Sequence, residues 1–488
     1  MFDRILKLGK ETAIYGLSTV VGRLLNFLLV PFYTNLLIPA EFGVIANVYA
    51  YIAFVVVVYG YGMEQTYMRF VSSIEIGDKP QNFSSPFFSL LGTSLAFSSA
   101  IHVCAPGIAS LIDLNNDQAH IVQYAAWILC CDTIALIPFA SFRMEHRAKV
   151  FAALKLTNIG LTLLLNVVFL LILGMKIEGV FLANLLASGT TCVISIWMVR
   201  ASITLRFSSR LYKEILRFGL PLIPAGLAGV AMQVVDRPII KALTNDATLG
   251  IYQANYRLGI FMMLVVGMFD YAWRPFFLNH ANDPDAKQMF GKVLTYLSIL
   301  LMSVFLVAAM LIEDVVRLQV MGKYLIHPDY WPGLSIVPWT LLAYVFTGFY
   351  TMFVPGVYLE KKTYFIPFNS GFGAALKVAL NYAFIPSFGL MGAAQATLWS
   401  YVVMAAGMFF ISQRFYRIAI EWGKIMNVML LALGLYALST LLSPDAGSLS
   451  GIFIKIAIVA SYVVMLYLIR IVDKNEVDQL KAVLARNP

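Results

Sequence analysis

The sequence has 488 residues, of which 60% are hydrophobic and only 12% are charged. Its mean hydropathy of +0.79 is typical of a chain that crosses a membrane many times, and it excludes an ordinary soluble domain. The formal net charge of +9 does not indicate a nucleic-acid partner, because the basic residues are distributed as in a polytopic membrane protein.

Apolar stretches long enough to cross the hydrocarbon core occur throughout the chain. A helix of about twenty residues spans that core, and the sequence contains about fourteen such stretches. Backbone groups cannot remain unpaired in lipid, so we predict an all-α polytopic fold. The expected spans are residues 11–37, 42–63, 84–112, 118–141, 149–173, 177–200, 213–239, 249–273, 290–313, 333–357, 363–386, 389–412, 422–443 and 449–471.

The basic loops predict the orientation of the chain. With the N-terminus inside, most lysines and arginines fall on the cytoplasmic side, whereas Lys176, Lys241, Arg317 and Lys323 fall outside. This asymmetry is the positive-inside rule, and it predicts that both termini lie in the cytoplasm. The four cysteines lie within spans and have no metal-ligand spacing, so they indicate packing residues.

Polar residues form stripes along several expected helices of the first half. Arg23 and Asn26 share one helical face with small and hydroxyl-bearing residues, which indicates a cavity lining. A similar stripe in residues 149–173 contains Lys155. Asp132 has mostly apolar neighbours on its face, and Asp132 and Asp270 are candidates for ion or proton coupling. Asp132 could equally pair with a basic residue of another helix.

The two halves of the chain are related by a shift of 207 residues. The shift overlays Gly22 on Gly229, Gly43 on Gly250 and Tyr49 on Tyr256, across both helices of a hairpin. Such a repeat predicts two lobes related by a pseudo-twofold axis along the membrane normal. We therefore expect an N-lobe (1–212), a C-lobe (213–415), two peripheral helices (416–472) and a cytoplasmic tail (473–488). In the peripheral pair, we expect Lys455 to reach toward the outer membrane surface.

The C-lobe carries several ionisable groups at membrane depth, where each costs about 2.5–3.5 kcal/mol on insertion scales. Asp236 and Arg237 follow Pro221 and Pro224 on one expected span. Arg257 and Lys377 lie on two later spans. We expect Arg257 and Lys377 to be unpaired cavity cations, and Arg237 to be partnered by Asp236. A purely structural Asp236–Arg237 pair that closes a helix end is the alternative. The candidate substrate-binding residues are Arg23, Asn26, Gln233, Asp236, Arg237, Arg257, Lys377 and Asn381.

Signatures of catalysis are missing from the sequence. It contains no GxxxxGK[ST], HExxH or GxSxG motif, and its five histidines are scattered. We therefore expect a transporter rather than an enzyme, with no cofactor and no metal. Because the cavity candidates are mostly cationic, and guanidinium groups suit phosphate, an amphiphilic anion such as a saccharide-bearing lipid phosphate is the favoured substrate.

These residues resemble the polysaccharide transporters of the MOP flippase superfamily. The resemblance rests on Phe218–Pro221, the Asp236–Arg237 pair, residues 250–252, Arg23, and the turn at 39–43. It covers essentially the whole chain and implies a MATE-like fold with a rocker-switch between two six-helix lobes. It also implies transport of undecaprenyl-pyrophosphate-linked oligosaccharide across the bacterial inner membrane. The oligosaccharide would serve the biosynthesis of surface polysaccharide: the O-antigen of lipopolysaccharide, capsule or exopolysaccharide. Arg23 and Arg257 occupy places where relatives have arginines proposed to hold the pyrophosphate.

Other functions remain open at this point. A lipid II-type flippase shares fourteen helices and a cationic cavity, but no dense basic cluster lies beside Arg23. Drug and cation antiporters of the superfamily use acidic residues, whereas the first span here holds an arginine. A scaffold within a polysaccharide-assembly complex is the third alternative. Other assembly proteins are possible partners beside the lipid-linked substrate and the bilayer.

Overall fold

The computed structural model describes residues 21–22, 24–25, 27–73, 78–320, 322–442, 447–469 and 471. It divides into two compact units, the first formed by Met1–Ala254 with Ser370–Ala393 and the second by Asn255–Asn369 with Ala394–Pro488. This division differs from the predicted lobe boundary at 212/213, because residues 213–254 and 370–393 pack with the first unit. The lobe boundaries themselves stay a prediction.

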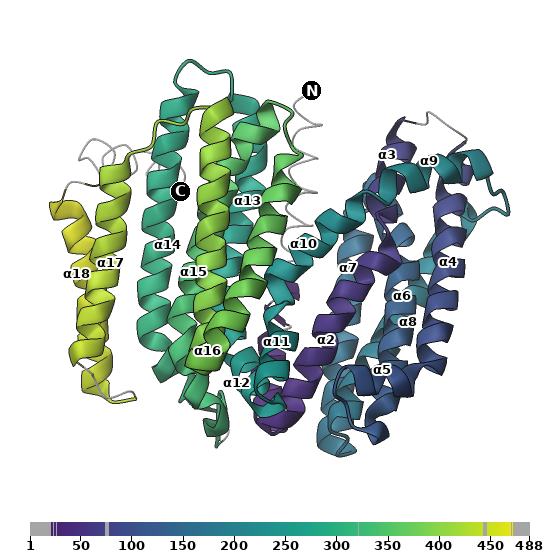
Figure 1. Ribbon diagram of the computed structural model, residues 1–488, viewed down its shortest axis with the longest axis horizontal. Coiled ribbons are helices and arrows are strands. Elements are labelled where there is room, and N and C mark those ends of the chain that lie inside the picture. Colours follow the sequence, from purple (N-terminus) through teal and green to yellow (C-terminus); the bar gives the residue numbers. More distant parts are fainter. Residues whose placement is uncertain are drawn as a thin grey trace. The chain divides into compact units, whose positions relative to one another are not determined.

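The first unit is a helical bundle in which segments remote in sequence pack side by side (Figure 1). Aromatic and aliphatic residues of α3, α4, α6, α8 and α9 form one of its cores. Its elements are α2 (Pro39–Gly60), α3 (Met63–Ser73), α4 (Lys79–Val103), α5 (Ala105–Leu111), η1 (Asn116–Gln118), α6 (Ala119–Met144), α7 (Ala148–Asn166), η2 (Val167–Ile172), α8 (Ile177–Val199), η3 (Arg200–Ser202), α9 (Ser209–Gly219), α10 (Leu222–Val234), α11 (Asp236–Leu243) and most of α12 (Asp246–Tyr256).

The second unit is also helical, with one short hairpin in which Gln319–Val320 (β1) pairs antiparallel with Lys323–Tyr324 (β2). The long helix α16 (Phe365–Phe415) contributes to both units. The remaining elements are η4 (Arg257–Gly259), α13 (Ile260–His280), α14 (Ala286–Val316), η5 (Pro328–Ile336), α15 (Val337–Leu359), α17 (Trp422–Leu442) and α18 (Leu449–Leu468).

The predicted all-α membrane fold is confirmed. Within the described ranges, eleven helices are long and apolar enough to cross a membrane, or twelve if the bent pair α9–α10 is one span. At 1.5 Å per residue, the 51 residues of α16 would extend roughly 75 Å, far more than one hydrocarbon core. Its backbone is non-helical at Gly389 (φ 55°), and it therefore contains the two expected spans 363–386 and 389–412. The first expected span, 11–37, is described only in part, because residues 11–20, 23 and 26 lie outside the described residues.

Helices α2 and α12 meet in a reciprocal contact within the first unit. A Cβ atom on Gly43 would lie 1.8 Å from Asp246 O, and one on Gly250 would lie 1.9 Å from Pro39 O. The shift of 207 residues that overlays Gly43 on Gly250 also places Pro39 on Asp246. Each copy of the repeat thus contacts the other through the same pair of positions, as in an isologous interface. The duplication and the twofold relation of the lobes stay a prediction.

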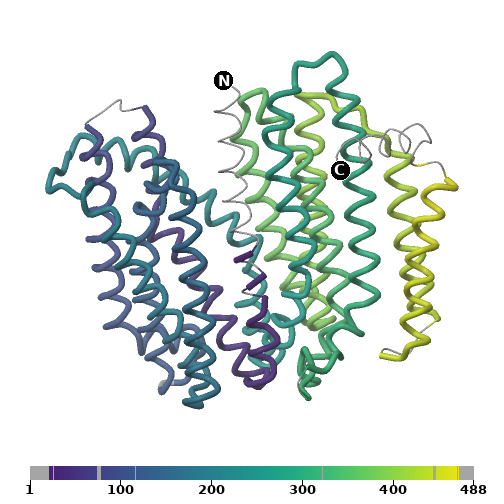
Figure 2. Tube along the Cα trace, turned by 180° about the vertical axis from the view of Figure 1, so that it is seen from behind, coloured from purple at the N-terminus to yellow at the C-terminus, as the bar shows by residue number. Residues whose placement is uncertain are grey.

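Helices α17 and α18 pack against each other and against α14 in the second unit, as both views show (Figures 1 and 2). A buried ion pair joins α18 to α14, because Lys455 Nζ lies 2.6 Å from Asp314 Oδ2. The N–H of Gly447 donates to Asp314 Oδ1 at 2.7 Å. Our expectation that Lys455 reaches the outer surface is therefore wrong: the side chain is buried at 6% exposure, because Asp314 neutralises its charge within the helix packing.

Candidate functional site

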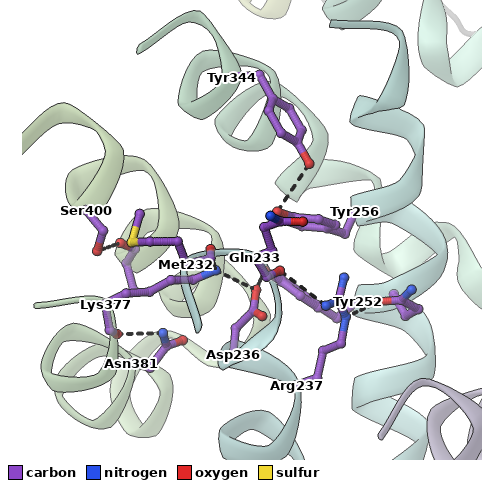
Figure 3. Close-up of polar contacts among 12 residues, drawn as sticks. Met232, Gln233, Asp236, Arg237, Tyr252, Tyr256, Tyr344, Lys377, Asn381 and Ser400 are labelled. Carbon is purple, nitrogen blue, oxygen red and sulfur yellow. Dashed lines mark hydrogen bonds and ion pairs between the residues drawn. The ribbon is translucent and has the colours of Figure 1, made fainter. Parts of the chain in front are cut away.

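A buried ion pair lies near the break between α10 and α11 in the first unit (Figure 3). Lys377 Nζ is 3.3 Å from Asp236 Oδ2, and both side chains are fully buried. Tyr252 OH donates a 2.6 Å hydrogen bond to the same oxygen, and Lys377 Nζ donates to Met232 O at 2.9 Å. The other carboxylate oxygen, Asp236 Oδ1, accepts no hydrogen bond from the described residues. The two charges compensate each other away from solvent.

The helix breaks here because of its sequence. Pro238 has no N–H to donate to Val234 O, and its ring crowds that carbonyl, so regular hydrogen bonding stops around Val235. Asp236 becomes the first residue of α11, where the positive end of the helix dipole favours a carboxylate. The proline therefore positions the acid.

Two cations satisfy the carbonyls at the end of α10. The last turn of a helix carries unsatisfied C=O groups and a partial negative charge, which cations stabilise. Lys377 donates to Met232 O, as described, and Arg237 Nη1 donates to Gln233 O at 3.2 Å. Arg237 Nε also donates to Gln253 Oε1 at 2.7 Å. Lys377 and Arg237 thus help to hold the break in one geometry (Figure 3).

Lys377 differs from its predicted environment. We expected an unpaired cation in water, and this is wrong because Asp236 neutralises it and the surrounding helices bury it completely. Asn381, one turn along α16, is also fully buried and donates from Nδ2 to Lys377 O at 2.7 Å. Whether any of these residues contacts substrate stays a prediction.

Arg257 lies in the second unit, on the short 3-10 turn η4 that joins α12 to α13, and its side chain is half-buried. Next to it, Tyr344 OH donates to Tyr256 OH at 3.3 Å (Figure 3). Gly259 leaves room for the ring of Tyr344, since a Cβ there would approach it to 3.2 Å. A candidate substrate cation thus sits at an interruption of its span, where backbone groups are less regularly paired.

The remaining candidates have varied environments. Arg23 and Asn26 lie outside the described residues, so their predicted meeting with Arg257 stays a prediction. Asp270 is paired on its own helix, with Arg274 Nη2 at 2.9 Å from Oδ2 and Nε donating to Oδ1 at 3.1 Å. Asp132 is accessible to solvent on α6. The coupling roles of Asp132 and Asp270 likewise remain predictions.

Sequence reasoning missed two partners of the buried pair, Tyr252 and the carbonyl of Met232. Tyr252 belongs to the stretch 250–252 that carries the family resemblance, but the sequence does not show that its hydroxyl meets Asp236, because that contact depends on what α11 places opposite it. Pro238 was the available signal for the break in the helix, since a proline inside a span leaves the C=O four residues earlier, that of Val234, without its usual donor. It does not single out the carbonyl of Met232.

Comparison with known proteins places the chain in a family. Residues 34–325, well over half of the sequence, match the family described as "Polysaccharide biosynthesis protein". The chain belongs to this family. No curated protein sequence matches it.

Solved structures show that the family member has the fold of MOP superfamily transporters. The chain is similar to the lipid II flippase MurJ in an inward closed conformation, with a TM-score of 0.74 at 16% identity over 93% of this chain and 99% of that one. It is also similar to a multidrug resistance MATE family transporter of the MOP superfamily, inward-facing, with a TM-score of 0.65 at 16% identity over 86% and 99% of the two chains. The outward-facing form of such a transporter gives a TM-score of 0.58 at 16% identity, over 83% and 95%.

Proposed function

We propose that this protein is a flippase that moves a lipid-diphosphate-linked oligosaccharide from the cytoplasmic to the outer leaflet of the bacterial inner membrane. The observation that carries the proposal is membership of a polysaccharide biosynthesis family in a chain folded as a MOP transporter. An undecaprenyl-pyrophosphate carrier, assembly of O-antigen, capsule or exopolysaccharide, and contact with other assembly proteins all belong to this proposal. The proposal also includes a cytoplasmic location of both termini, and alternating access by movement of the lobe 1–212 against the lobe 213–415.

The chemistry of the substrate follows from the charges at membrane depth. Arg257 is a half-buried guanidinium on a broken span, and guanidinium groups bind phosphate oxygens in a bidentate manner. We assign it, with Arg23, to the diphosphate. An anionic head group that moves outward across an inside-negative membrane gains about 2.3 kcal/mol per charge per 100 mV, so the membrane potential assists transport. Transport of this kind needs no catalytic residue.

The proposal is tested with purified protein in lipid vesicles. A fluorescent lipid-diphosphate disaccharide is incorporated, and dithionite quenches only the molecules in the outer leaflet. Without protein, about half of the signal should persist, whereas the wild-type protein should expose nearly all of it. Arg257→Ala should slow the exchange at least tenfold, which corresponds to about 1.4 kcal/mol. Arg257→Lys should retain part of it.

Lys323→Ala on the exposed hairpin is the matched control, because it removes a positive charge outside the spans. Equal rates of exchange in Arg257→Ala and Lys323→Ala would reject the assignment of Arg257 to the diphosphate. Absence of any exchange by the wild type would reject the proposal that the protein is a flippase. The likeness to the lipid II flippase makes a peptidoglycan-type lipid the second candidate, and the same assay with a muramyl-pentapeptide head group tests it. Transport of a lipophilic cation instead would identify an antiporter.

A further inference from the structure

A layer of polar side chains from α2, α7 and α8 lies within the first unit at membrane depth. Asn184 of α8 donates to Tyr49 OH of α2 at 2.7 Å, and Ser188 donates to Asn184 Oδ1 at 3.3 Å. One turn farther along the same helix, Thr191 accepts a 3.2 Å hydrogen bond from Asn158 of α7. We call these residues, with Asp132 and Lys155, the polar layer.

Asp132 and Lys155 supply the charges of the polar layer. Asp132 interacts with the hydroxyl of Ser188 and, at longer range, with Lys155. Asp132 lies midway along α6 (Ala119–Met144), and Lys155 lies two turns into α7 (Ala148–Asn166). Asp132 is therefore too far from either end of α6 to be explained as an interfacial charge.

Both charged side chains are exposed to solvent, although protein atoms surround each of them closely. That combination describes groups in a recess rather than on a convex, lipid-facing surface. A charge at the centre of a membrane helix is costly and is kept where it faces water or a ligand. The geometry thus indicates that an aqueous space reaches the polar layer.

Lys155 is held loosely, in contrast to Lys377. Its Nζ lies 5.0 Å from the centroid of the Phe139 ring, a cation–π contact that is weak where water is present. Within the described part of the chain, no carboxylate lies in ion-pair contact with it. Lys377 lies on the equivalent helix of the other expected lobe and is neutralised and buried. Of these two lysines, Lys155 is therefore the one available to a ligand.

We propose that Lys155 and Asp132 form a second substrate-contact site. Lys155 binds an anionic oxygen group of the transported molecule there, and this group replaces Asp132 as the counter-ion of the lysine. The group is a phosphate of the lipid carrier or a carboxylate of the saccharide. This inference rests on the proposed function for the identity of the ligand. The fixed hydrogen bonds of Asn158, Asn184 and Ser188 keep the site in shape while its counter-ion changes.

Binding to purified full-length protein tests the site without requiring transport. Two probes distinguish the sources of the anion: farnesyl diphosphate for the carrier and glucuronate for the saccharide. Calorimetric titration of the wild type should detect one of them. Lys155→Ala should weaken that binding at least tenfold, and Lys155→Arg should retain most of it. Asp132→Asn should tighten it severalfold, because the competing carboxylate is gone.

Lys149→Ala is the matched control, because Lys149 is exposed on the same helix but lies at its cytoplasmic end. It should bind as the wild type does. Three results would overturn the site: no binding of either probe to the wild type at millimolar concentration, unchanged binding by Lys155→Ala, or weakened binding by Asp132→Asn. If Lys155→Ala loses binding while the wild type flips no lipid-linked saccharide in vesicles, the site stands and the proposed function fails. If the wild type flips that lipid while its binding is independent of Lys155, the site fails and the proposed function stands.

Discussion

The buried pair of Asp236 and Lys377 stabilises a broken helix through charges that cannot reach water. Removal of one partner leaves an uncompensated buried charge, which costs about 3–5 kcal/mol. We therefore expect Lys377→Met and Asp236→Leu each to lower the unfolding temperature of the solubilised protein strongly, as measured by intrinsic fluorescence. Because Asp236 Oδ1 accepts no hydrogen bond from the described residues, the pair is not optimally satisfied.

The double variant provides the control. Replacement of both partners by apolar side chains of similar size is often neutral, so Lys377→Met with Asp236→Leu should be more stable than either single variant. Additive losses in the double variant would mean that the two residues stabilise the protein independently, against the paired geometry. Lys155→Met, on an exposed lysine, should leave the unfolding temperature nearly unchanged.

Helical spacing predicted which residues share a face, but not what lies opposite that face. Lys377 and Lys155 each lie on a polar stripe in the sequence, and both stripes look alike. Their environments differ because α11 places Asp236 against Lys377, whereas Lys155 faces a ring and a more distant acid. The ionisable positions of the site were therefore predictable, while their burial and pairing were not.

At the scale of elements, the starts of α2 and α12 approach so closely that only glycine fits at the contact. The atoms that a methyl group would meet at Gly43 and Gly250 are backbone oxygens, at 1.8 and 1.9 Å. These atoms cannot rotate away as a side chain does. An added methyl group should therefore lower the free energy of unfolding by at least about 1–3 kcal/mol, the usual cost of overpacking.

We expect Gly43→Ala and Gly250→Ala each to lower thermal stability and the yield of folded protein, measured by size-exclusion chromatography of fluorescently tagged protein. Gly160→Ala on α7 is the control, because no atom lies within 4 Å of its added methyl group. In an exposed helix that substitution should be neutral or stabilising by up to about 1 kcal/mol. Equal behaviour of all three variants would contradict the close contact.

Most helices were predictable because apolar length is a strong signal, whereas their interruptions were not. Each expected span after residue 40 coincides with one or more helices, or with one part of α16, among the described residues. Among the interruptions, the kink at Gly389 is the exception, because it lies at the predicted boundary between the spans 363–386 and 389–412. The breaks at Val235 and Arg257 depend on single residues within apolar runs. Window-averaged hydropathy does not respond to them, although prolines such as Pro238 give partial warning.

At the scale of the whole molecule, the bent pair α9–α10 decides the topology of everything that follows. The two helices meet at 42° and qualify as one broken span or as a re-entrant segment. If they form a span, three crossings separate Arg206 from Lys323, and the two residues lie on opposite sides of the membrane. If they are re-entrant, two crossings remain and both residues lie on the same side.

Labelling of single cysteines distinguishes these topologies. In a variant without Cys104, Cys130, Cys131 and Cys192, a membrane-impermeant maleimide applied to intact cells should label Lys323→Cys. It should label Arg206→Cys only after permeabilisation, as the positive-inside rule predicts. Labelling of both from outside would identify a re-entrant α9–α10, and the reverse pattern would invert the predicted orientation.

The reciprocal contact of α2 with α12 also has a consequence for the protein's history. Positions 43 and 246 touch, as do 250 and 39, so a residue in one copy of the repeat constrains the copy 207 residues away. Divergence after a duplication is therefore expected to be slowest at these four positions. In a pairwise mutational scan, substitutions near 246 that shift the backbone should rescue a bulky residue at position 43. Substitutions near 39 should rescue a bulky residue at position 250 in the same way. The two sets of compensating pairs would then be related by the same shift of 207 residues as the repeat.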